Sequence, residues 1–332
     1  MLKKRLLAML LALTLCFTTA GCLVKNEWED WDYSAEDMAK PSQDPDDQGQ
    51  ASSVNPLLYK VTDSSGTVLW LFGSIHLGLP EFYPLPDYVL NAFDGADTLA
   101  VEVDIIAFNK DQEARTEAIR ELRYKDGSVV TDHIPHDLHG KAKDLLKNAN
   151  LYSEAMNNYM PALWSMYVDN ASYQKVQVKS SYGVDRHMLN LAYEQNKPIY
   201  SIESGKFQYA MMASFSPELQ QLLLEESVRK YTEGTADQTL TDLAHMWASG
   251  DVEKLTEVLE DDSIPTSSKA LYEEYLNAMF VQRNKNMTQY AESALRSGKE
   301  VFICVGAGHI IGDYGIAQQL EDLGYTVEIV SK

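Results

Sequence analysis

The chain contains the same short arrangement twice, an apolar segment that runs directly into Gly-x-x-His. The first copy, VLWLFGSIHLG, contains Gly73 and His76, and the second, VFICVGAGHIIG, contains Gly306 and His309 near the other end of the chain. A continuous apolar run is typical of a buried parallel strand, and open α/β sheets bind ligands just beyond the carboxyl ends of their strands. Glycine before each histidine lets the backbone turn or approach another group closely. The repeated pattern therefore predicts one site built from both ends of the chain.

Either copy alone would also fit a turn glycine followed by a structural histidine. The chain has only seven histidines, and two of them share the same strand, glycine and spacing. The repetition favours a shared functional site.

The fold class that these segments predict is α/β, with a mixed sheet built from two β-α-β halves, each carrying Gly-x-x-His. Helices flank the sheet, and a large helical insertion separates the halves. Right-handed crossovers would bring the two motifs to one edge of the sheet. The strand-like runs cover 58–64, 67–76, 98–105, 197–203, 300–309 and 325–330, and the main helical patterns cover 84–94, 151–174, 217–233 and 267–296.

Carboxylates stand at equivalent strand ends. Alternation in TLAVEVDI places Glu102 and Asp104 on one face at the rim of the sheet, and Glu203 ends KPIYSIE in the same way. Such acids also commonly cap helices or pair with lysine. Histidines together with a carboxylate suit divalent metal binding, or metal-free catalysis in which the acid orients an imidazole base.

The N-terminus predicts export. A basic start, MLKKR, precedes a short apolar run and the small residues Thr19, Ala20 and Gly21, which lead to Cys22. Residues 1–21 resemble a bacterial lipoprotein signal peptide, which predicts lipidation of Cys22; the alternative is an ordinary secretory signal with an incidental cysteine. We expect a protein anchored to the bacterial cell envelope, with its domain on the extracytoplasmic side.

The composition of the rest of the chain distinguishes a tether from a folded domain. Residues 22–55 are acidic and end in the polar run PSQDPDDQGQASSVN, which predicts a lipid anchor followed by a disordered tether, and the folded domain is expected at 56–332. The chain has 28 basic and 49 acidic residues, a formal net charge of −21, which argues against nucleic acid as a partner. Cys304 lies within an apolar strand and is expected to be a buried hydrophobe.

Five blocks of the chain, in order, resemble the TraB/GumN family. They are GSIHLGLPEFYPLPDYVLNAFDGADTLAVEVD, SYGVDRHMLNLAYEQNKPIYSIES, WASGD, QRNKNM and VFICVGAGHIIGDYGIAQQLEDLGYTV. The wider group includes the Tiki proteins, which have two Gly-x-x-His motifs and are described as membrane-tethered, metal-dependent proteases. It also includes erythromycin esterases and ChaN-like haem-iron proteins.

The resemblance implies a site containing His76, Glu102 and His309, with Arg283 as a cationic neighbour that could hold an oxyanion or a substrate carboxylate. Asp185 falls in a family block, but its plainer interpretation is an N-cap for a helix over 185–196. The three histidines of DHIPHDLHG are interpreted as surface residues; they are His133, His136 and His139. Two further histidines, His187 and His245, have no supporting pattern.

The predicted function is therefore a metal-dependent hydrolase, most simply a peptidase. His76, His309 and Glu102 would bind Mn²⁺, Co²⁺ or Zn²⁺ and activate water. Two alternatives remain open, a metal-free hydrolase with a histidine base and a non-catalytic lipoprotein that sequesters or regulates a peptide.

Overall fold

The computed structural model describes residues 52–259 and 268–330. The predicted signal peptide, Cys22 and nearly all of the tether lie outside these described residues.

The described residues form one mixed sheet of six strands, in the order β4-β3-β5-β2-β1-β6. Strand β5 lies between β2 and β3 and runs parallel to both, although it is separated from them by most of the chain. Strand β1 is antiparallel to its neighbours β2 and β6. The strands are β1 (Leu58–Thr62), β2 (Val68–Ser74), β3 (Thr98–Val101), β4 (Ile199–Ser201), β5 (Val301–Gly306) and β6 (Thr326–Val330). This arrangement confirms the predicted fold class.

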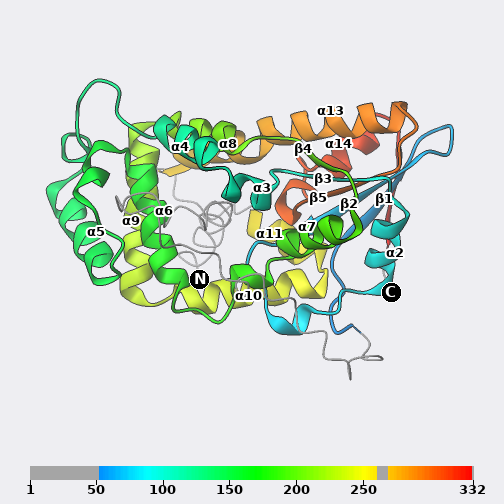
Figure 1. Cartoon of the computed structure of the whole chain (residues 1–332), viewed down its shortest axis with the longest axis horizontal. Coiled ribbons are helices and arrows are strands. Elements are labelled where there is room, and N and C mark those ends of the chain that lie inside the picture. Colours follow the sequence, from blue (N-terminus) through cyan, green and yellow to red (C-terminus); the bar gives the residue numbers. More distant parts are fainter. Residues whose placement is uncertain (1–51, 260–267, 331–332) are drawn as a thin grey trace.

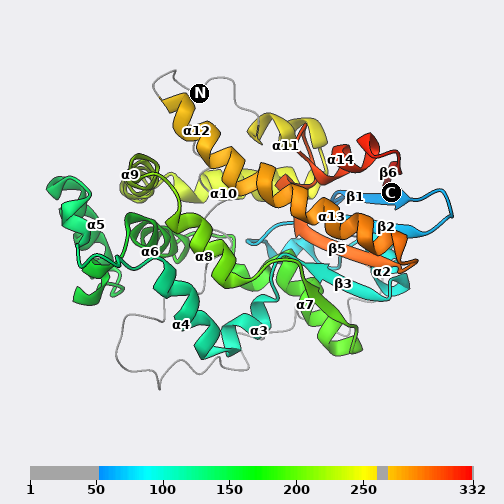
Figure 2. The same ribbon diagram turned by 90° about the horizontal axis from the view of Figure 1, so that it is seen from above.

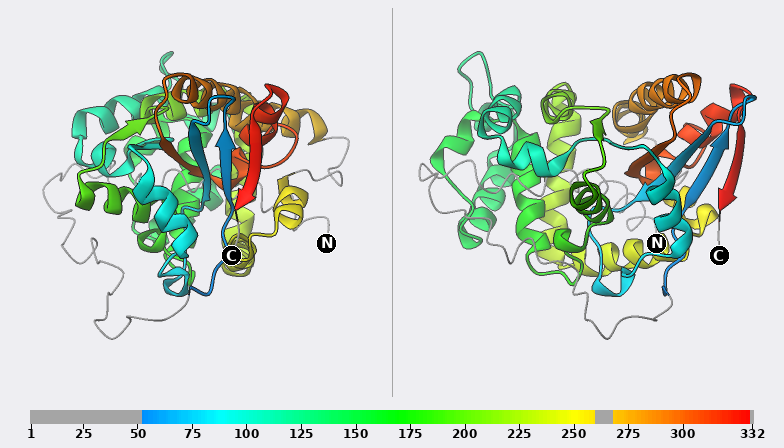
Figure 3. Two further views of the ribbon diagram at one scale, coloured as in Figure 1. Left: turned by 90° about the vertical axis from the view of Figure 1, so that its right-hand side faces the viewer. Right: turned by 45° about the vertical axis from the view of Figure 1, so that its right-hand side comes forward.

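Helices cover both faces of the sheet because the central strands are apolar on both sides. Alternate residues of β5 enter different cores: Phe302 and Cys304 face one side, and Ile303 and Val305 face the other. The first core is covered by α2 (Asp87–Gly95), α7 (Val184–Gln195) and α10 (Ala236–Ser249). The second is covered by α11 (Val252–Leu259), α13 (Gln282–Arg296) and α14 (Ile316–Asp322), and Figures 2 and 3 show α13 lying along the sheet.

The middle of the chain forms a separate helical layer beside the sheet (Figure 1). It has its own apolar core around Trp164 and Tyr167, both fully buried. This layer is the predicted helical insertion. Its helices, with the short α3 that leads into it, are α3 (Ile105–Lys110), α4 (Gln112–Glu121), α5 (His136–Asn148), α6 (Pro161–Tyr173), α8 (Gly205–Ala213), α9 (Pro217–Glu233) and α12 (Lys269–Leu276).

Most predicted helices are present, with corrected boundaries. Helix α9 spans the predicted 217–233, with Ser216 as N-cap and Gly234 at φ +64° after its end. The helix predicted over 151–174 begins only at Pro161, since proline fits the first helical turn and disfavours a helix before it. The helical pattern predicted over 267–296 divides into α12, a π-helical turn η8 (Asn277–Val281) and α13.

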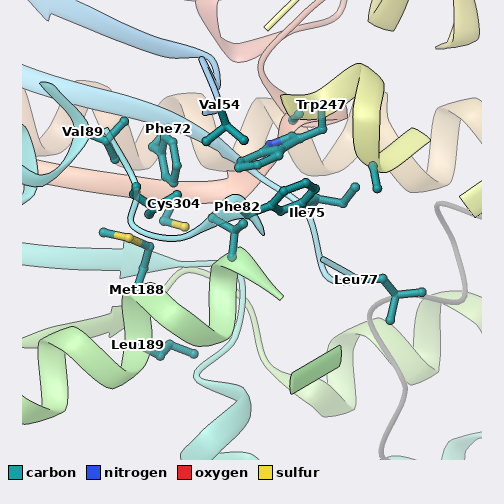
Figure 4. Packing of buried hydrophobic residues seen from close by; sticks show 14 of the residues in the cluster. Val54, Phe72, Ile75, Leu77, Phe82, Val89, Met188, Leu189, Trp247 and Cys304 are labelled. Carbon is teal, nitrogen blue, oxygen red and sulfur yellow. The ribbon is translucent and has the colours of Figure 1, made fainter. Parts of the chain in front are cut away.

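The first core also encloses the turn that follows β2. Figure 4 shows Trp247 of α10 beside Phe82 and Val54, with Cys304 on β5 below Phe72. The indole of Trp247 donates a hydrogen bond of 2.7 Å to the carbonyl of Gly73, which ties α10 to the first motif. Cys304 is the only cysteine among the described residues, and it is buried, as predicted. No helix within 52–259 and 268–330 is long and apolar enough to cross a bilayer.

Candidate active site

The two Gly-x-x-His motifs meet at one edge of the sheet. Ser74, the last residue of β2, is in register with Gly306, the last residue of β5. A Cβ on Gly73 would lie 3.1 Å from both the Cα and the Cβ of Ala307. Glycine at position 73 therefore allows the turn of the second motif to pack directly against the first.

Glu102 connects this edge to the neighbouring strand. It follows β3 directly, and its Oε1 accepts a 2.8 Å hydrogen bond from the backbone N–H of Gly306. A Cβ on Gly306 would lie 3.4 Å from the same oxygen. The carboxylate therefore lies against the backbone of the second motif, and three adjacent strands contribute to one site.

His76 is held by the segment that begins α7. Its Nδ1 is 2.8 Å from Oδ2 of Asp185, and the N–H of Val184 donates to the carbonyl of Ile75 at 2.8 Å. A Cβ on Gly183 would lie 2.4 Å from the carbonyl oxygen of His76, so a larger residue cannot occupy that position without a shift. The N-cap interpretation of Asp185 is wrong: Gly183 is the N-cap, and the carboxylate of Asp185 orients the imidazole instead.

His309 is oriented by an amide. Its Nδ1 is 2.6 Å from Oδ1 of Asn284, whose Nδ2 donates to the carbonyl of Tyr314 at 2.7 Å. These bonds assign the proton of the neutral ring to Nδ1 and leave Nε2 unprotonated. Burial, reinforced by the positive charge of Arg283, lowers the pKa of His309 to about 3. The ring is therefore neutral at pH 7.

Arg283 binds two glutamates in the interior. Its Nη2 is 2.5 Å from Oε2 of Glu102 and 2.8 Å from Oε2 of Glu203, and its Nε is 2.8 Å from Oε1 of Glu203. The guanidinium is 1% exposed. Gln208 donates a further 2.9 Å bond to Glu203. Arg283 is thus committed to carboxylates of the protein, which argues against its predicted role as the ligand of a substrate carboxylate.

Glu102 remains ionised despite its burial. Burial by itself would raise its pKa, but the interactions with His309, Arg283 and His76 and the bond from the Gly306 amide hold the pKa below its usual range. Since His309 is neutral at pH 7, the permanent charge of Arg283 is the main stabilising influence there.

A pocket joins these groups. His76, Glu102, Arg283 and His309 line it on the side of the sheet edge, and its empty volume of about 780 Å³ includes the open space at its mouth. Much of the remaining lining is apolar and comes from α10, α11 and η8. Its residues are Leu243, Trp247, Leu255, Val258, Leu259, Met279 and Phe280.

The chemistry of the donors fits a divalent cation. The unprotonated Nε2 of His309 faces Oε1 of Glu102 at 3.7 Å, too far for a hydrogen bond and close to the separation of about 3.4 Å expected for two ligands of one tetrahedral ion. The formal charges of Glu102, Glu203 and Arg283 leave one negative charge, and Asp185 adds a second. A divalent ion would balance both.

The spacing of the full set is less favourable. Within residues 52–259 and 268–330, no three side chains of His, Cys, Asp or Glu lie close enough together to hold a metal ion. His76, His309 and Glu102 share a pocket without forming a ready three-ligand site, so metal binding remains a prediction.

Other candidates lie elsewhere. Asp104 does not share a face with Glu102, because β3 ends at Val101 and Asp104 caps α3 by accepting hydrogen bonds from two backbone N–H groups. His133, His136 and His245 are exposed, and His139 and His187 are half-buried outside the pocket. Asn284 was missed, although it directly follows Arg283 in the QRNKNM block.

Comparison with known proteins identifies the family of this chain. The chain belongs to the TraB/PrgY/gumN family, whose model matches residues 57–329. It is 26% identical over 253 residues to an uncharacterized protein, YbaP, of Escherichia coli (strain K12), a match covering 75% of this chain and 86% of YbaP. YbaP of Shigella flexneri matches to the same extent. No solved structure matches the chain.

Proposed function

We propose that this protein is a hydrolase whose pocket uses the paired Gly-x-x-His motifs to activate water, and that its substrate is a peptide. One observation carries the proposal: both imidazoles line one pocket with the buried Glu102–Arg283 pair, and each has its Nδ1 engaged by an oxygen from a helix. Ring nitrogens fixed in this way are typical of both general bases and metal ligands.

The protein groups have distinct roles in this proposal. Asp185 keeps the proton of His76 on Nδ1, so that Nε2 can accept a proton from water. Asn284 does the same for His309, and burial keeps that ring neutral. Arg283 keeps Glu102 ionised beside them.

A divalent cation is part of the proposal. His76, His309 and Glu102 would hold Mn²⁺, Co²⁺ or Zn²⁺, and the bound ion would lower the pKa of a water ligand and polarise the substrate carbonyl. Because a protonated imidazole cannot bind a metal, occupancy would fall with decreasing pH.

The setting follows from the N-terminus. We propose that lipidated Cys22 anchors the protein to the bacterial cell envelope and that residues 22–55 hold the domain on the extracytoplasmic side. Peptides at the envelope would then be its accessible substrates.

The test is cleavage of a peptide library by the purified full-length chain, with and without a chelator, followed by addition of Mn²⁺, Co²⁺ or Zn²⁺. His76→Ala and His309→Ala should each abolish cleavage, and the double variant should lose little more, because residues that act together are non-additive. His245→Ala, on the exposed surface of α10, is the control and should remain active. Cleavage that survives both histidine variants would refute the proposal.

The requirement for a metal ion can be refuted independently of hydrolysis. Full activity after exhaustive chelation, with no stoichiometric metal by elemental analysis, would leave a histidine-base hydrolase. Peptide binding without cleavage under every metal condition would instead favour sequestration.

A further inference from the structure

Ser74 occupies the point where the two motifs meet. It is the last residue of β2, is in register with Gly306 and stands two residues before His76. Its side chain lines the pocket and is 2% exposed. A hydroxyl in this position is shielded from bulk water, yet it borders the space that a ligand would enter.

The Ser74 hydroxyl differs from those of the other buried serines. Among the described residues, the other three each donate a hydrogen bond: Ser165 to the carbonyl of Ala162 at 2.9 Å, Ser172 to that of Val168 at 3.2 Å, and Ser227 to Asp169 at 2.9 Å. The Ser74 hydroxyl makes no hydrogen bond to an oxygen or nitrogen atom of the described residues. The Cys304 thiol lies beside it, but burial raises the pKa of that thiol, which remains protonated and is a weak partner.

Buried polar groups in folded proteins are almost always hydrogen-bonded, and each exception calls for an explanation, such as a catalytic role, a water molecule or an ion. Where the group lines a pocket, as Ser74 does, a bound ligand can supply the missing partner. The pocket contains acceptors, since the Nδ1 of His309 is engaged by Asn284 and Glu102 is ionised. Donors are scarcer because Arg283 is bound to two glutamates. A substrate carbonyl accepts hydrogen bonds, and the Ser74 hydroxyl is a side-chain donor on the pocket wall that is not bonded to an oxygen or nitrogen of the protein.

We propose that Ser74 is a substrate-contacting residue, whose hydroxyl donates a hydrogen bond to a carbonyl oxygen of the bound peptide beside the paired histidines. This inference rests on the proposed hydrolase function and assigns that pocket a specific contact with the amide backbone of its substrate. No covalent role for Ser74 is involved.

The first test is independent of activity. Ser74→Ala and Ser227→Ala are compared in the full-length chain by thermal unfolding. Ser227→Ala removes an internal hydrogen bond and should lower the Tm, whereas Ser74→Ala should leave it unchanged or raise it. A fall in Tm for Ser74→Ala as large as that for Ser227→Ala would overturn the inference, because the hydroxyl would then be bonded within the protein.

The second test measures the contact itself, with pooled N-acetylated tripeptide amides as the probe. These peptides should raise the Tm of the wild type, and Ser74→Ala should lose that shift while Ser74→Thr, which keeps a hydroxyl, retains it. On any peptide that the wild type cleaves, kcat/KM of Ser74→Ala should fall about tenfold or more. Equal thermal shifts in the wild type and Ser74→Ala, or no shift in the wild type, would overturn the inference.

The two tests also separate this inference from the proposed function. Absence of cleavage with a peptide-induced shift that depends on Ser74 would refute hydrolysis and retain the contact. Cleavage that Ser74→Ala leaves unchanged would retain hydrolysis and refute the contact.

Discussion

The burial of His309 predicts a specific loss of stability in acid. Its pKa is about 3 in the folded protein and about 6.5 in an unfolded chain. The folded state therefore binds this proton less readily than the unfolded state does, so the free energy of unfolding should fall as the pH drops below about 6.5 and continue to fall towards pH 3. Each pH unit within this window is worth about 1.4 kcal/mol, which gives a loss of about 2 kcal/mol between pH 6.5 and pH 5.

His309→Gln isolates this contribution, because glutamine has no titrating group. Urea unfolding of the wild type and the variant, followed by tryptophan fluorescence in chelator from pH 7.5 to pH 5, gives the two free energies. Titrating groups remote from position 309 cancel in the difference. Glu102 lies beside this position, but Arg283 also lowers its pKa, so it is expected to stay ionised in both proteins over this range. The wild type should therefore lose about 2 kcal/mol relative to His309→Gln over this range.

His245→Gln serves as the matched control, since this histidine is exposed on α10. Between pH 7.5 and pH 5, the free energy of unfolding of the wild type should show no comparable loss relative to that of His245→Gln. If the gap between the wild type and His309→Gln stays constant within about 0.5 kcal/mol, the reasoning about burial at this site is refuted.

Four further outcomes are expected. Arg283→Met removes the cation shared by two buried carboxylates and should lower the free energy of unfolding by about 3–5 kcal/mol; an unchanged urea midpoint would contradict the buried network. Gly73→Ala should lose about 1–3 kcal/mol because its Cβ would crowd Ala307, and adding Ala307→Gly should recover part of the loss in the same assay. Asp185→Asn should lower kcat/KM on any cleaved peptide by about tenfold or more while the protein stays folded by circular dichroism; full activity would exclude its orienting role. Cys22→Ser should release the protein from the membrane fraction or leave the precursor unprocessed, and acyl labelling of the wild type provides the direct check.

The main architecture could be predicted because it depends on local patterns. The apolar runs ending in Gly-x-x-His specify buried strands, and β2 and β5 lie side by side with their histidines at the same edge. Helix α9 was predictable to its ends, since Ser216 and Gly234 are strong boundary residues. The long helical patterns were less reliable where a proline or a π-helical turn divided them.

The partners of the histidines were harder to predict because they depend on tertiary packing. Asp185 had the right spacing for an N-cap, and only the approach of α7 to the first motif reveals its bond with His76. Asn284 and Arg283 are consecutive in sequence yet serve different groups, which a helical pattern cannot distinguish. The commitment of Arg283 to both glutamates likewise depends on where β3 and β4 end.

The central place of β5 in the sheet sets the order in which the protein can mature. Strands β2 and β3 are synthesised before β5, but each pairs with β5, which follows only after the whole helical insertion. Contacts between segments so distant in sequence form slowly, since a long loop must close first. A growing chain that has not yet reached β5 therefore has an open sheet and one histidine motif, and the candidate active site cannot be assembled until β5 and the second motif have been synthesised.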